Sequence, residues 1–97
     1  METTTFIKAC AALDGAILDL LSGGWEEASR RRAHEIAVAL RQSARSMGRR
    51  DSESDLRAVE SLLSLSSREV LPIRCEVEHR LFEFLGLLKN PTVTRSA

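Results

Sequence analysis

Apolar residues recur along most of the chain at spacings of three and four positions, which places their side chains on one face of an α-helix. In the first segment this repeat consists of Phe6, Cys10, Leu13, Ile17 and Leu20. Ser22-Gly23-Gly24 then supplies a stop signal, because glycine tolerates the left-handed backbone that closes a helix. The pattern predicts a helix over residues 5–21, followed by a tight reversal.

The same spacing predicts three further helices. Trp25 opens a segment with an alanine-rich inner face, which indicates a helix over residues 25–46 that its neighbours can approach closely. A repeat from Leu56 to Leu88 keeps its phase across the second half of the chain. Pro72 interrupts it, because proline has no amide hydrogen and crowds the carbonyl four residues before it. We therefore expect helices over about 53–65 and 68–89.

These elements predict an all-α fold, an antiparallel four-helix bundle. We expect one bundle domain over residues 1–90, because 97 residues are too few for a second core. Residues 91–97 contain little apolar surface and are expected to form a flexible tail. Gly23, Gly24, Trp25 and Pro72 are predicted to have structural roles at the two irregular points of the chain.

Charge and composition exclude several partners. The 14 basic and 14 acidic residues balance, so no overall field favours nucleic acid or an anionic membrane. The apolar runs are far shorter than the roughly 20 residues that span a bilayer, and the N-terminus lacks the features of an export signal. We expect a cytoplasmic protein in which Cys10 and Cys75 are reduced thiols, with a disulfide as the less favoured alternative.

We find no arrangement of residues that predicts catalysis. His34 and His79 are the only histidines, and neither has ligands at metal-site spacing. Gly23-Gly24 lacks the further glycines or lysine of a phosphate-binding loop, and no nucleophile elbow is present. The sequence therefore predicts a protein that is not an enzyme and that uses neither a metal nor another cofactor.

Two segments are candidates for binding a protein partner. Residues 30–50 contain seven arginines against a single acid, Glu35. We interpret most of them as partners of acids on the next helix. A nucleic-acid surface is less favoured, because no aromatic residue is interleaved, and an acidic protein bound through Arg41 and Arg45 is the intermediate alternative.

The second segment is 81–88, where six of eight residues are large and apolar and cannot all face one thin core. We predict that a partner contacts Leu81, Phe82, Phe84, Leu85 and Leu88. Phe82 and Leu85 are expected on a different side of the helix from the other three. The alternatives are that this helix is central in the bundle, or that a second copy of the chain covers it in a homodimer.

Gly24-Trp25-Glu26-Glu27-Ala28, after an apolar first helix, resembles the Gly-Asp-Trp-Asp/Glu-x-Leu opening of FliT-type flagellar export chaperones. The later stretch through Leu62-Leu63-Ser64-Leu65 to Leu81 resembles the third and fourth helices of that family. This resemblance implies a bacterial cytoplasmic chaperone that keeps a flagellar subunit, typically the filament-cap protein, soluble for export.

A second segment, Leu40-Arg41-Gln42-Ser43-Ala44, resembles part of the motif of histidine-phosphotransfer domains, which are also four-helix bundles. The phosphorylated histidine of that motif falls at Val38 here, and its glycine falls at Gln42. His34 lies one helical turn before Val38. This resemblance implies a signalling domain without the usual phosphate acceptor, which we keep as the alternative to a chaperone or adaptor.

Overall fold

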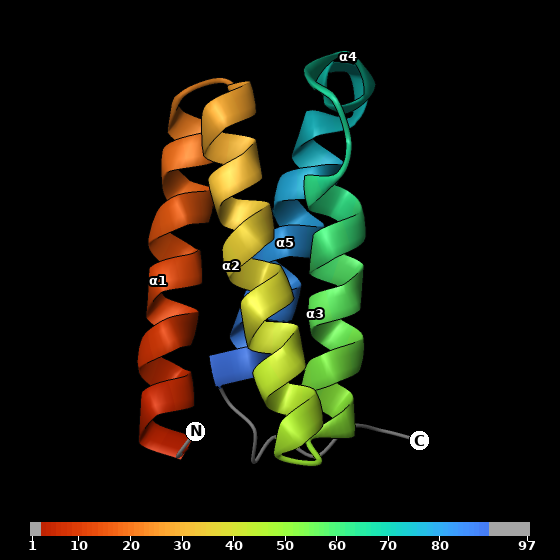
Figure 1. The fold of residues 1–97 in the computed structure, drawn as a ribbon. Helices are drawn as coiled ribbons and strands as arrows, with labels where there is room; N and C mark the ends of the chain where they lie inside the picture. The colour runs from red at the N-terminus through yellow and green to blue at the C-terminus, as the bar shows by residue number, and fades with distance from the viewer. Residues whose placement is uncertain (1–2, 90–97) are drawn as a thin grey trace.

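Four long helices run alternately in opposite directions and enclose one core (Figure 1). The computed structural model describes residues 3–89, with side-chain surroundings for residues 5–88. The long helices are α1 (Thr3–Ser22), α2 (Glu27–Ser46), α3 (Arg50–Leu63) and α5 (Arg74–Lys89). α1 packs against α2 and α5, and α3 packs against the same two helices. The prediction of an antiparallel four-helix bundle is confirmed, and the predicted tail lies outside the described residues.

The reversal between α1 and α2 is built on two consecutive residues with left-handed backbone. Gly24 has a φ of 77° and Trp25 a φ of 67°. The amide of Trp25 donates a hydrogen bond of 2.9 Å to the carbonyl of Leu20, which closes the end of α1. Because Trp25 is not helical and Glu26 is the extended N-cap, α2 begins at Glu27, later than the predicted residue 25.

The predicted helices of the second half differ more from the structure. Gly48, with a φ of 71°, lets the chain turn sharply after α2, so α3 begins at Arg50 and not at residue 53. The predicted helix 68–89 is three elements: α4 (Ser67–Val70), a 3₁₀ turn η1 (Leu71–Ile73) and α5. A reciprocal capping box between Ser66 and Glu69 starts α4. Pro72 lies in η1, where it interrupts the helical repeat as the sequence predicts.

The core is built from the inward faces of all four long helices. Its fully buried side chains include large residues of α1, α3 and α5, whereas the buried residues of α2 are three alanines and one leucine, Ala33, Ala37, Leu40 and Ala44. Small residues on α2 allow α1 and α3 to approach it closely, since interhelical distance follows side-chain size. The apolar repeat continues from α3 to α5 across the break because both helices line this one core.

Candidate functional site

α5 buries most of the apolar segment that the sequence predicts as a partner site. Leu81, Leu85 and Leu88 have exposed fractions of 0, 3 and 1% and belong to the core. Phe84 is partly buried against it, and Phe82 is 48% exposed. The prediction that Leu85 shares a side of the helix with Phe82 is therefore wrong. α5 packs against both α1 and α3, so its buried face is wide enough to include Leu85.

The exposed large apolar side chains are confined to one half of the bundle. Within the described part of the chain they are Ile7, Leu18, Leu71, Ile73 and Phe82. Two belong to α1, two to η1 and one to α5, and none to α2 or α3. Single exposed apolar residues are ordinary on protein surfaces, but five that avoid two of the four long helices indicate an uneven surface.

Leu71, Ile73 and Phe82 form what we call the η1–α5 surface. Leu71 is 77% exposed, and Pro72 holds it in a 3₁₀ turn that no long helix covers. A hollow of about 300 Å³ lies at this turn and is lined by residues 71–76. Cys75 is exposed in it, whereas Cys10 is buried in the core, and the two do not form a disulfide. Leu71 and Ile73 of this surface line the hollow, and Phe82 lies further along α5.

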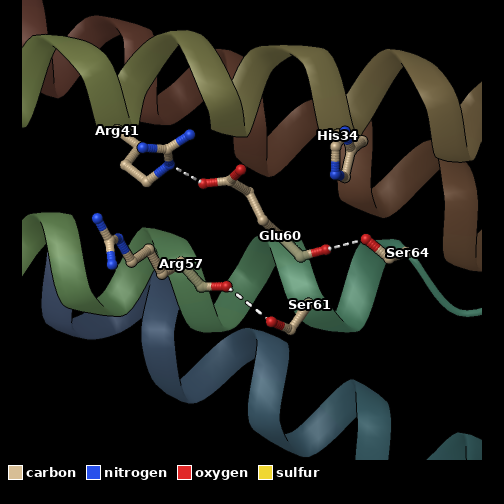
Figure 2. A pocket seen from close by; sticks show the side chains of 6 residues that line it. All are labelled: His34, Arg41, Arg57, Glu60, Ser61 and Ser64. Carbon is tan, nitrogen blue, oxygen red and sulfur yellow. Dashed lines mark hydrogen bonds and ion pairs between the residues drawn. The ribbon is translucent and has the colours of Figure 1, made fainter.

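The seam between α2 and α3 is polar and includes Arg41 of the arginine-rich segment 30–50. Arg41 of α2 forms a hydrogen-bonded ion pair with Glu60 of α3, and both side chains are mostly buried (Figure 2). Along the seam an open depression of about 490 Å³ is lined by His34, Arg41, Arg57, Glu60, Ser61 and Ser64. The hydroxyls of Ser61 and Ser64 donate to backbone carbonyls one turn earlier, so their protons are already used within α3.

Arg45, the other arginine of the predicted partner site, lies on the exposed surface of α2. It has no ion-pair partner among residues 3–89. Arg41 is thus held inside the seam by Glu60, whereas Arg45 is available to an external acidic group. The two arginines lie one turn apart on α2 and differ in what they can bind.

Trp25 connects two turns at the same end of the bundle. Its side chain is 5% exposed, and the indole Nε1 donates a hydrogen bond of 2.8 Å to the carbonyl of Leu65, in the turn after α3. Gly23 precedes it in a tight position, because a Cβ added there would lie 3.1 Å from the backbone oxygen of Asp19. Trp25 therefore fixes the α1–α2 reversal against the α3–α4 turn.

Two arginines complete this end of the bundle by binding helix C-termini, whose last carbonyls have no partner within their own helix. Arg30 of α2 donates a hydrogen bond of 2.8 Å to the carbonyl of Leu63, the last residue of α3. Arg74, the first residue of α5, donates to the carbonyl of Leu21 near the end of α1. The sequence pattern did not predict these contacts, because they depend on which helix ends lie side by side.

Arg30 also binds Glu27 through two side-chain hydrogen bonds, one of them 3.0 Å from Nε to Oε2. These hydrogen bonds, together with the positive charges of Arg30 and Arg31, hold the pKa of the Glu27 carboxyl below its ordinary value. Because Glu27 is in the first turn of α2, its negative charge also complements the positive end of the helix dipole.

The described residues contain no group of three or more His, Cys, Asp or Glu side chains that could hold a metal ion. No helix within residues 3–89 is both long and apolar enough to cross a membrane. The candidate sites are the apolar η1–α5 surface and the charged α2–α3 seam.

Searches against protein-family models, curated proteins and solved structures gave no match for this chain.

Proposed function

We propose that the chain is a non-enzymatic protein-binding module that acts in the cytoplasm and covers an apolar segment of a client protein. The observation that supports this proposal is the uneven distribution of exposed large apolar side chains. Within the described residues they occur on α1, η1 and α5 but not on α2 or α3. Rigid apolar groups beside a hollow are suited to anchoring a partner's side chains. The η1–α5 surface, Leu71, Ile73 and Phe82, is the proposed client site.

The proposed client is a subunit that must be kept soluble before export. The resemblance of the Trp25 region to FliT-type flagellar chaperones supports this choice, as does the hydrogen bond of Trp25 to Leu65 in the turn that leads into α4 and η1. An exposed Arg45 could bind an acidic group of the same client as a secondary contact. The function then requires no bound metal, no other cofactor and no catalytic group.

A capture experiment from the source cell tests the proposal. Tagged wild-type protein is compared with a Leu71→Glu, Phe82→Glu double variant, in which both substituted side chains are exposed and the core is unchanged. Arg80→Glu is the matched control, because it also places a glutamate on the exposed surface of α5. We expect wild type and control to retain an export or flagellar protein that the double variant loses. Equal retention by all three would refute the η1–α5 surface as the client site.

A histidine-phosphotransfer role is the second candidate, and one observation favours it. His34 lines the depression between α2 and α3 and points toward α3, with Glu60 between it and Arg41 (Figure 2). Its side chain is partly accessible, and Arg41 and Arg57 of the same depression are cations of the kind that bind phosphate. Incubation with a phosphorylated receiver domain should then label the wild type but not His34→Gln. Absence of label on the wild type would remove this candidate.

A further inference from the structure

Six residues on the outward surface of α1 form three pairs. The two members of each pair lie at equal distances on either side of one point near the middle of the helix. Ile7 and Leu18 are 40 and 51% exposed, and they are 11 residues apart. Lys8 and Asp19 are also exposed and 11 residues apart. Eleven residues are about three helical turns, or roughly 16 Å, so both members of each pair lie on the same side of α1.

The third pair is Ala11 and Gly15, both exposed and one turn apart. All three pairs are centred between residues 12 and 14, level with Leu13. At about 100° of rotation per residue, the pairs follow one another across the surface: the two apolar residues form one edge, the small pair the middle and the charged pair the other edge. We call these six residues the α1 outer face.

We infer that the α1 outer face binds the same face of a second copy of this chain, with the two α1 helices antiparallel and a two-fold axis level with Leu13. This axis brings Lys8 opposite Asp19 of the second copy, and Ile7 opposite Leu18 of the second copy. In a two-fold interface the same surface of both copies is in contact, so that surface must be complementary to itself. The antiparallel arrangement makes both the apolar edge and the charged edge self-complementary. A parallel two-fold arrangement would instead place the charged edge of one copy against the apolar edge of the other.

Charge complementarity identifies the second copy as the occupant. Lys8 and Asp19 have no ion-pair partner among residues 3–89. In the antiparallel dimer each Lys8 lies opposite an Asp19 of the other copy, so the interface contains two such charge pairs. The middle of the face is compatible with close helix approach, because a Cβ at Gly15 would meet nothing within 4 Å in the single chain.

This inference does not depend on the proposed client, whose site lies on η1 and α5. Both surfaces can be occupied at once, since the dimer contact uses α1 alone. A dimer would present two client sites, and linking two sites in one particle raises the avidity for a client that has two matching segments.

Sedimentation velocity over a concentration series of the full chain tests the inference. We expect a reversible dimer of the wild type. Lys8→Glu and Asp19→Lys should each raise the dimer Kd roughly tenfold, because each creates two like-charge pairs in the symmetric contact. The double variant Lys8→Glu, Asp19→Lys restores opposite charges and should restore the wild-type Kd. Glu35→Lys, an exposed charge reversal on α2, is the control and should leave the Kd unchanged.

Leu18→Glu tests the apolar edge and should give a monomer with unchanged helix content by circular dichroism. A wild type that stays monomeric throughout the series would overturn the inference. A dimer that the single charge reversals leave intact, or that the double variant does not recover, would overturn it as well, because the contact would then lie elsewhere.

Discussion

Replacing Trp25 with alanine should remove a large part of the stability of this bundle. The indole is 5% exposed, sits between the α1–α2 reversal and the turn after α3, and donates a 2.8 Å hydrogen bond to the Leu65 carbonyl. Trp25→Ala therefore leaves a cavity and removes the one side-chain donor that joins these two turns. Its effect is on folding, and no partner is needed to observe it.

The magnitude follows from burial. Substituting alanine for a buried Trp or Phe costs about 3 to 5 kcal/mol, including the cavity that remains. A chain of this length has roughly 5 to 15 kcal/mol of total stability. At about 4 to 8 °C per kcal/mol, Tm should fall by on the order of 12 to 40 °C. The left-handed φ of 67° persists in Trp25→Ala, so Trp25→Gly, which removes that strain, should be at least as stable as the alanine variant.

Urea unfolding followed by far-ultraviolet circular dichroism is the suitable assay, because Trp25 is the only tryptophan and the variants lose its fluorescence. Trp25→Phe is the matched control: it keeps most of the apolar volume and loses the N–H donor, so its cost should be nearer 1 to 2 kcal/mol, on the scale of about one hydrogen bond. A free energy of unfolding for Trp25→Ala within about 1 kcal/mol of wild type would refute the role of the indole in joining the two turns.

Three further predictions concern individual contacts. Arg30→Met should raise the pKa of the Glu27 carboxyl toward its ordinary value in an NMR titration. Because the folded-state pKa is lowered in wild type, the contact stabilises the fold at pH values above the unfolded-state pKa, and this stabilisation is lost as pH falls through the folded-state pKa. Gly86→Ala should stabilise the chain by about 0.5 to 1 kcal/mol in thermal unfolding, since an added Cβ meets nothing within 4 Å in α5. A double-mutant cycle with Arg41→Met and Glu60→Gln should give a coupling of about 1 kcal/mol or more, because both partners are mostly buried; additive effects would contradict this.

The sequence was sufficient to predict the helices because their apolar spacing is a local property. The stripe from Phe6 to Leu20 determines which face of α1 is buried whatever that face contacts, and Gly23-Gly24 ends a helix by backbone geometry alone. The predicted boundaries were less accurate where a single backbone angle decides them. The left-handed conformation of Trp25 moved the start of α2, and a positive φ is not expected of a tryptophan.

The candidate site was harder to predict, because burial depends on which helices surround a segment. Phe82 and Leu85 have the same apolar character in the sequence, yet Phe82 is 48% exposed and Leu85 is 3% exposed. The difference follows from the two helices that flank α5, whose positions the local pattern does not contain. For the same reason the arginine contacts to the carbonyls of Leu21 and Leu63 were not predicted.

The uneven surface of the bundle has a physical origin in its inner faces. α2 contributes mostly small alanines to the core, and its Arg41 forms an ion pair with Glu60 of α3. The contact between α2 and α3 is therefore partly polar. α1 contributes large residues inward and still carries Ile7 and Leu18 outward, with few charges between them. An apolar surplus on α1 cannot be buried by rotating the helix, because rotation would expose Leu13 or Ile17 instead. It can be covered only from outside, and contact with another chain is the means that leaves the core intact.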